Sequence, residues 1–454
     1  MTRNRLVIAL LAVAVGGCAD YAPRPLPLRP DAPASAAAIA VDPARLPFRD
    51  LSTHRFDSSD GLDIDEVAML AVANNPQLRA ARDALGIARA QSFAAGLLPD
   101  PQLGITADHP TSGLGFVNAF GLTPSYDVNA LLLRSSRMGV AHANERQVDL
   151  DLLWREWQVV SQARLLFTRL TAQDAVLREL ESVRRVLDRR YRADRKALAD
   201  GDLTIDVTSS DLVALQRTER QVNDLERAQL QNRGSLNALL GLSADADLQL
   251  VGAPRLPALD AARLRSEVPL RLAQRPDLRA LRAGYRSQEE KFRGEVLAQF
   301  PALTVGLTRA RDTSDLYTLG FGLSLSLPMF NANRGNIAIA DATRSKLYDE
   351  YQARLDAARG DVDTALTNID LLQRQVRRTR EGVAQLGRAD LRADAAFRAG
   401  DMSAPVHERL RIALLDKKTE AINLEEALME QRIALQTLLG PDLRGPAADP
   451  GGAR

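Results

Sequence analysis

The sequence contains little of what catalysis and metal binding require. One cysteine in 454 residues cannot form an intramolecular disulfide bond, and the four histidines are scattered, with no Cys/His cluster at metal-ligand spacing. No glycine-rich phosphate loop precedes a predicted helix, and no carboxylate–histidine–nucleophile set is indicated by spacing. We therefore expect a protein that is not an enzyme and that holds neither a cofactor nor a metal ion.

Aromatic residues and net charge are also scarce. Aromatic residues make up 4% of the chain, and 59 basic residues offset 58 acidic ones, for a formal charge of +1. This near-neutrality gives no general reason to bind nucleic acid. Alanine, leucine, arginine and acidic residues dominate instead, which is typical of long helices and coiled coils.

The first residues are typical of an export signal. A basic start precedes an apolar stretch at 6–15, about half the length of a membrane-spanning helix, and Gly16-Gly17-Cys18 follows. This pattern resembles a bacterial lipobox, in which the cysteine is acylated and becomes the mature amino terminus; an ordinary secretory peptide is the alternative. Ala19 after the cysteine favours the outer membrane. We predict a signal peptide at 1–17 and lipidation of Cys18.

The rest of the chain is a tandem repeat that follows a proline-rich linker. Asn75-Pro76-Gln77-Leu78-Arg79-Ala80 recurs as Arg275-Pro276-Asp277-Leu278-Arg279-Ala280, and Leu239-Leu240-Gly241 recurs as Leu438-Leu439-Gly440. Segments that match at so many points indicate that one half of the chain is a duplicate of the other. The predicted domains are a lipid anchor and Pro/Ala-rich linker at 18–60, a first repeat at 61–243, a linker at 244–268, a second repeat at 269–441 and a tail at 442–454.

Each repeat is predicted to contain the same elements in the same order. A first helix (66–98 or 270–299) precedes a β-hairpin, a long helix (128–199 or 332–399), a Gly-Asp turn and a return helix. The long helix spans about 105 Å, and the two shorter ones together match that length. Such pairs suit the wall of a hollow cylinder, although periodicity alone also allows a filamentous coiled coil.

The second hairpin carries the alternation expected of a membrane strand. In residues 317–328 large apolar side chains alternate with glycine and serine, which suits a wall between lipid and water. A soluble hairpin covered by a core is the alternative, but no other domain is predicted to cover it. The first hairpin is less regular, with strands at 101–108 and 116–124. The predicted lipid-facing residues are Leu303, Val305, Leu307, Leu319, Phe321, Leu323, Leu325 and Leu327.

Four strands cannot close a membrane barrel, because the smallest such barrels have eight strands. An open edge in lipid would leave backbone groups without partners. If the strands are in the membrane, the protein must therefore form oligomers. Two copies would supply eight strands and three copies would supply twelve.

Over residues 60 to 441 the chain resembles the TolC-type outer-membrane factor family. The resemblance is carried by the duplicated unit and by the segment 323–331, Leu-Ser-Leu-Ser-Leu-Pro-Met-Phe-Asn, with 123–127 as its counterpart in the first half. Residues 96–103 resemble the heavy-metal efflux branch. The implied fold is mainly α with a small β part: an elongated trimeric α-helical barrel joined to a 12-stranded transmembrane β-barrel, with four strands per protomer.

The resemblance also implies a function. The chain would be the passive exit duct of a tripartite efflux pump, conducting small molecules or metal ions across the outer membrane. Its partners would be two further copies of itself, a periplasmic adaptor and an inner-membrane pump of the RND type. A structural coiled-coil lipoprotein that tethers the outer membrane and a type I protein-secretion outlet are the alternatives.

Two sets of site residues follow from the resemblance. Family members meet their adaptors at the helical hairpin tips, where glycine suits a helix C-cap and Thr or Ser the next N-cap. Some members also carry paired aspartates past the second tip that narrow the aperture, where this chain has Val406 and Arg409. The adaptor-docking candidates are Gly201, Asp202, Leu203, Thr204, Gly400, Asp401, Met402 and Ser403. The candidate aperture charges are Asp206, Asp211, Glu408 and Arg409.

Overall fold

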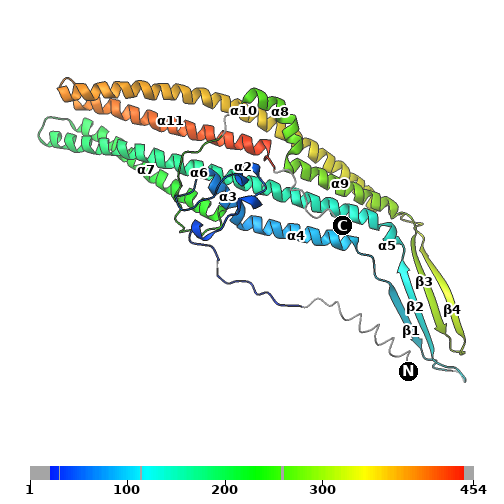
Figure 1. Ribbon diagram of the computed structural model, residues 1–454. Coiled ribbons are helices and arrows are strands. Elements are labelled where there is room, and N and C mark those ends of the chain that lie inside the picture. The colour runs from blue at the N-terminus through cyan, green and yellow to red at the C-terminus, as the bar shows by residue number, and fades with distance from the viewer. Residues whose placement is uncertain (1–20, 30, 113–114, 257–259, 444–454) are drawn as a thin grey trace.

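The computed structural model describes residues 21–443 except residues 30, 113–114 and 257–259. Its helices lie side by side in one elongated body, with a sheet at one end and two helical hairpin tips at the opposite end (Figure 1). Within the described part of the chain, no helix combines the length and apolar character needed to cross a membrane. The predicted signal peptide and Cys18 lie outside the described residues.

Two successive sets of elements follow the same order along the chain. Before both sets come short helical turns at Ala36–Ala38 and Pro43–Arg45 and helix α2 (Arg49–Ser52). The first set comprises α3 (Ile64–Asn74), α4 (Pro76–Gly96), β1 (Gln102–Asp108), β2 (Ala119–Asp127), α5 (Asn129–Leu132), α6 (Arg134–Ala199) and α7 (Ile205–Leu239). The second set is α8 (Ala261–Gln274), α9 (Pro276–Leu297), β3 (Ala302–Arg311), β4 (Tyr317–Ser326), α10 (Arg334–Ala399) and α11 (Ala404–Leu439). The two long helices, α6 and α10, each contain 66 residues.

The first helix of each repeat is broken, so the predicted continuous helices at 66–98 and 270–299 are wrong. The breaks fall at Asn75 and Arg275, whose ψ angles are 126° and 129°. Each residue precedes a proline, which lacks an N–H and disfavours helical backbone at the residue before it. α3 and α4, like α8 and α9, are therefore separate helices that change direction at the proline.

At each break, a side chain donates a hydrogen bond to the end of the return helix of the same repeat. The side-chain amide of Asn75 donates to the carbonyl of Leu239 at 2.8 Å. Arg275 donates from its guanidinium to the carbonyl of Leu438 at 3.0 Å. The same contact is thus made by two different side chains at equivalent repeat positions. It satisfies carbonyls that a helix end otherwise leaves without partners.

The main core lies beside these breaks. Val67 to Val72 of α3 are almost completely buried, together with Phe167 of α6 and Leu236 of α7. In the second repeat a smaller core joins α8 and α9 to α10 and α11. α6 contacts α3, α4, α7, α9 and α11, so it connects the two repeats along their length.

The strands form one antiparallel sheet in the order β1-β2-β3-β4, so the two hairpins are joined side by side through β2 and β3. β2 begins at Ala119 and ends at Asp127, later than the predicted strand 116–124. Asn118 instead lies in the connecting loop, where its Oδ1 is 2.7 Å from His109 Nδ1. The β2–β3 ladder has no pairing at Thr123 and Pro124, because proline has no N–H to donate.

Candidate functional site

One face of the sheet is apolar across all four strands except at the end of β3, where Arg309 and Arg311 lie on it. The register places Leu303 opposite Leu325, Val305 opposite Leu323 and Leu307 opposite Phe321. The side chain of Phe321 is 70% exposed, and Leu319 is 81% exposed. The same face continues through Tyr126 and Leu122 of β2 to Ile105 of β1. The eight predicted lipid-facing residues share this face, with Leu327 just past the end of β4. No other element of the described chain covers it.

The opposite face carries small and polar side chains. On β4 it presents Thr318, Gly320, Gly322, Ser324 and Ser326, and the register places Thr304, Gly306 and Thr308 of β3 beside them. Alternation of this kind, with two exposed faces of opposite character, separates an apolar environment from a polar one. A soluble sheet would instead bury its apolar face against a core.

The two Gly-Asp turns lie together at the end of the molecule farthest from the sheet (Figure 1). Gly201 and Gly400 have φ angles of +85° and +83°, which only glycine adopts without strain. At the first tip the N–H of Asp202 donates to Ala197 at 2.8 Å, and at the second that of Asp401 donates to Ala396 at 2.9 Å. Both turns are therefore Schellman motifs that stop the long helices at the same point.

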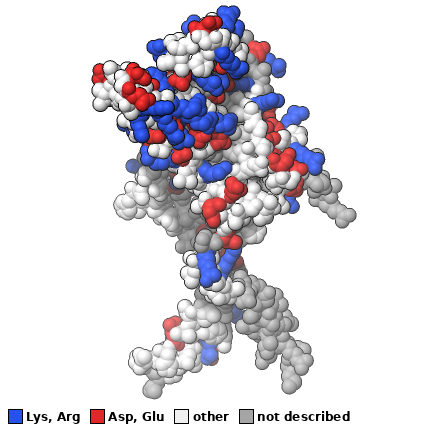
Figure 2. Space-filling view, turned by 90° about the vertical axis from the view of Figure 1, so that its left-hand side faces the viewer, with Lys and Arg blue, Asp and Glu red and all other residues white. Residues whose placement is uncertain are grey.

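The tip residues are accessible to a partner. Gly201, Asp202, Thr204, Gly400, Asp401 and Ser403 are exposed, and Leu203 and Met402 are half-buried. Thr204 and Ser403 occupy N-cap positions as predicted, but their side chains make no capping hydrogen bond. Their hydroxyls are thus left on the surface. Seen from the tip end, basic side chains gather in a broad patch over the helical part of the molecule (Figure 2).

The candidate aperture charges have different surroundings. Asp206 and Arg409 are exposed and Glu408 is half-buried. Asp211 is buried, and its Oδ2 pairs with Arg190 Nε of α6 at 2.8 Å. The charge of Asp211 is therefore directed at α6 and does not face solvent in this structure.

Charged side chains of both helical hairpins lie near that pair, and the charges of Arg190 and Asp194 act on Glu408 of the second hairpin. Arg190 also lies 3.7 Å from Asp194 of the same helix. On the second hairpin, His407 stacks on Phe397 with ring centroids 5.1 Å apart and lies 3.8 Å from Asp394. Sequence analysis missed this cluster, because only the i,i+4 spacing of Arg190 and Asp194 is visible in the sequence.

Two carboxyl groups of this region bind protons more tightly than usual. Burial, together with a hydrogen bond to Asp194, raises the pKa of Asp211 to about 6 against the opposing effect of Arg190. Burial also raises the pKa of Glu408, opposed by the charge of Arg190. The single guanidinium of Arg190 lies beside both Asp194 and Asp211, so adding a proton to one of these two carboxylates relieves their mutual repulsion.

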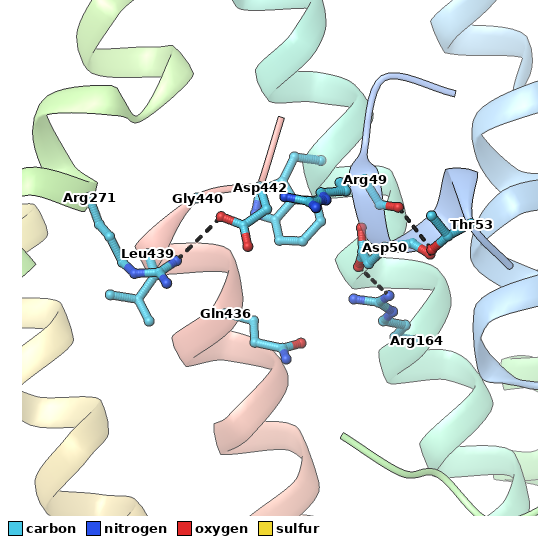
Figure 3. A pocket seen from close by; sticks show the side chains of 10 residues that line it. Arg49, Asp50, Thr53, Arg164, Arg271, Gln436, Leu439, Gly440 and Asp442 are labelled. Atoms are coloured by element: carbon cyan, nitrogen blue, oxygen red, sulfur yellow. Dashed lines mark hydrogen bonds and ion pairs between the residues drawn. The ribbon is translucent and has the colours of Figure 1, made fainter. Parts of the chain in front are cut away.

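A cavity of about 390 Å³ lies where the amino-terminal segment meets the end of α11 (Figure 3). Arg164 lines it, with a side chain only 5% exposed, and pairs with Asp50 at 3.0 Å and with Asp65 at 2.7 Å. Arg271 faces Asp442 at 3.7 Å across the cavity. Carboxylates of the chain already pair with both guanidinium groups. The residues that line the cavity therefore hold the amino-terminal segment and the end of α11 together.

These features define a class of protein. Two long helices of equal length, each with a hairpin attached, and a sheet with an exposed apolar face are the TolC-like channel fold. Residues 268–441 match the sequence model of the outer membrane efflux protein family. The resemblance predicted from the sequence is confirmed: the chain is similar to the TolC-type outer-membrane efflux proteins.

Relatives and solved structures agree with this assignment. The pyoverdine export outer membrane protein OpmQ of Pseudomonas aeruginosa is 26% identical over 440 residues, which cover 87% of this chain and 90% of that protein. The putative multidrug resistance outer membrane protein MdtQ of Shigella flexneri is 25% identical, with 82% and 84% covered. The Campylobacter jejuni CmeC outer membrane channel has a TM-score of 0.71 at 18% identity, with 84% and 86% covered, which shows the shared fold.

Proposed function

We propose that this chain is the outer-membrane exit duct of a tripartite efflux pump, and that it works as a homotrimer. The observation that carries the proposal is the four-stranded sheet, which has one exposed apolar face and two unpaired edges, β1 and β4. Pairing β4 of one copy with β1 of the next removes every edge once the ring closes. Three copies supply twelve strands, and their long helices continue as a tunnel in the periplasm.

The dimensions of the apolar face support a position in the membrane. On β4 the apolar side chains run from Leu319 to Leu327, a length of about 27 Å along the strand, or about 21 Å in height at the usual tilt. This approaches the apolar band of about 25 Å in outer-membrane barrels. Exposed aromatic residues lie beyond both ends of the face, with Tyr317 at one end and Phe300 and Phe330 at the other, as expected at the membrane surfaces.

The tips would meet the other pump components. We propose that Gly201, Asp202, Leu203 and Thr204, with Gly400, Asp401, Met402 and Ser403, contact the periplasmic adaptor, which connects the duct to an inner-membrane pump of the RND type. Their exposure and their position opposite the sheet support this role. Of the candidate aperture charges, we propose that Asp206 and Arg409 act on passing solutes, and their exposure supports this role. Glu408 is half-buried and would act less directly.

The remaining assignments complete the proposal. A signal peptide at 1–17 would direct export, and an acylated Cys18 would anchor the linker at 18–60 in the outer membrane. The repeats at 61–243 and 269–441 would form the body, joined by 244–268 and followed by a tail at 442–454. Passive transport of small molecules or metal ions is the proposed activity, and the names of OpmQ and MdtQ favour small molecules.

Heat-modifiability with crosslinking tests the proposal. The protein is extracted from outer membranes in mild detergent, and boiled and unboiled samples are run beside crosslinked material. We expect a trimer that resists the detergent until it is boiled. A monomer or dimer that is released without detergent would contradict the shared barrel and would favour a coiled-coil tether.

A further inference from the structure

Arg309 stands on the apolar face of the sheet, which is an unusual place for a charge. The register puts it directly between Leu122 of β2 and Leu319 of β4. It is exposed, and it has no ion pair within the part of the chain that the structure describes. An arginine facing lipid at mid-depth costs about 2–4 kcal/mol, a cost that falls to about 0–1 kcal/mol at the membrane surface. The position therefore requires an explanation.

The strand geometry places Arg309 at one end of the apolar face. Leu303, Val305 and Leu307 precede it on the same side of β3, and Arg311 follows it at the end of the strand. The connection to β4 begins there, on the side of the sheet away from the helices (Figure 1). If the helices are periplasmic, as proposed above, Arg309 lies at the outer surface of the membrane.

Arg311 adds a second basic group that is already partly engaged. Its Nε lies 2.6 Å from Asp315 Oδ1, and its guanidinium lies 5.7 Å from the ring centre of Tyr317. Residues two apart on a strand lie about 7 Å from each other on one face. Arg309 thus provides a free guanidinium, beside a second one that is held in position by an acid and an aromatic ring.

No strand position on this face supplies a negative charge to Arg309. The register gives the face Leu103, Ile105 and Ala107 on β1 and Phe120, Leu122, Pro124 and Tyr126 on β2, while β4 contributes tyrosine, leucine and phenylalanine. A neighbouring copy would present the same strands. Asp108 is on the opposite face, in phase with Thr106. The partner of Arg309 must therefore come from outside the sheet.

We propose that Arg309, with Arg311 beside it, binds a phosphate group of a membrane lipid in the outer leaflet. A guanidinium matches phosphate oxygens with two parallel N–H donors, and such charge-assisted bonds are among the stronger ones. The acyl chains of the same lipid would lie along Leu307, Phe321 and Leu323, which are on the same face. This inference rests on the proposed membrane position of the sheet.

Binding of a phosphorylated lipid to the purified full-length trimer in detergent tests the inference. The probe is lipid A, a phosphorylated glycolipid, and dephosphorylated lipid A is its control. We expect lipid A to raise the temperature at which the trimer dissociates, whereas the dephosphorylated form leaves it unchanged. Arg309→Gln should weaken the binding of lipid A about tenfold, the effect of losing a charged hydrogen-bonded pair. Arg359→Gln, at an exposed arginine of α10, should bind as the unmodified protein does.

The outcomes separate this inference from the proposed function. A stable trimer that binds both lipids equally, or an Arg309→Gln variant that binds lipid A normally, would overturn the lipid site and leave the channel proposal intact. Competition by inorganic phosphate at the same concentration would show a free-phosphate site and would also overturn it. If no heat-modifiable trimer forms at all, the proposed function itself fails, and the lipid site fails with it.

Discussion

At the scale of single residues, equivalent positions of the two repeats make the same hydrogen bond with different side chains. Asn75 and Arg275 both precede a proline, and both reach a carbonyl in the last turn of the return helix. Arg275 is additionally held by Asp277 at 2.7 Å and lies over the ring of Trp154. What the repeat retains is the hydrogen bond across the helix break, and either an amide or a guanidinium can donate it.

The raised pKa of Asp211 predicts a pH-dependent stability of the tip region. Its pKa of about 6 in the fold lies above the usual value of 3.8. The folded state therefore holds the proton more tightly, and this contribution to stability is present below about pH 4 and is lost as the pH rises through about 6. Asp211→Asn removes it, on the order of 2 kcal/mol. We expect the melting temperature of the variant to fall less between pH 4.5 and 7.5 than that of the unmodified protein.

Thermal melting followed by circular dichroism measures this effect. Asp206→Asn is the matched control, because Asp206 is exposed on the same helix, and its melting temperatures should follow the unmodified protein at both pH values. An Asp211→Asn variant with the same pH dependence as the unmodified protein would contradict the assignment.

Lipidation is a second prediction at the residue scale. Cys18 is the only cysteine of the chain, so it is the only residue that can carry the predicted modification. Cells expressing the protein should incorporate labelled palmitate into it, and Cys18→Ser should remove the label completely while leaving trimer formation intact. Label that remains in the variant, or none in the unmodified protein, would refute the predicted lipobox.

At the scale of elements, helix ends decide the shape of the molecule. Both long helices stop at a glycine with positive φ, and both return helices start four residues after that glycine. Since α6 and α10 have the same length, both tips reach the same end of the molecule (Figure 1). The proposed docking surface, which is composed of the two turns, would depend on this equality.

Two glycines, Gly360 inside α10 and Gly400 just past its end, allow a matched test of the turn. Gly400 has a φ angle of +83° at the tip, whereas Gly360 lies inside the helix, and a Cβ atom added at either position would meet nothing within 4 Å. Gly400→Ala should therefore cost about 1 kcal/mol through backbone strain alone. Gly360→Ala should instead stabilise the protein by up to about 1 kcal/mol, because alanine is the better helix former. Thermal melting should show opposite shifts; shifts of the same sign would contradict the assigned turn geometry.

At the scale of the whole molecule, the proposed trimer accounts for the exposed parts of the sheet. The described chain has a sheet with two open edges and an uncovered apolar face, held at one end of a helical body. Open edges and bare apolar surface would make an isolated protomer prone to aggregate. In the proposed trimer, closure with further copies and contact with lipid would remove both problems together.

Adjacent residues of β4 test which face of the sheet meets lipid. Leu323 is on the apolar face and Ser324 is on the opposite one. Leu323→Lys should cost about 2–4 kcal/mol in the membrane and strongly reduce the amount of heat-resistant trimer in outer membranes. Ser324→Lys should be tolerated, because its side chain would face water. Equal loss of trimer in both variants would argue against the proposed orientation.

Local patterns in the sequence determined much of this protein. The glycine turns, the long helices and the alternation of residues 317–328 were predictable, because helix caps and strand faces depend on neighbours only a few residues away. The residues of the apolar face and of the tips could be identified from these local patterns. The breaks at Asn75 and Arg275 were missed, although the prolines that cause them are visible, because helical periodicity continues on both sides.

Tertiary structure alone decided which side chains meet. In the sequence, Asp211 is one acid among many near a helix start. Only the packing of α6 against α7 buries it and brings it beside Arg190. The start of β2 likewise depended on pairing between strands, because Ala119 pairs with Asp108 of β1 and Phe120 pairs with Arg311 of β3, which is distant in the sequence. Contacts between distant residues are set by how whole elements pack, and burial and pKa follow from those contacts, so no local pattern contains them.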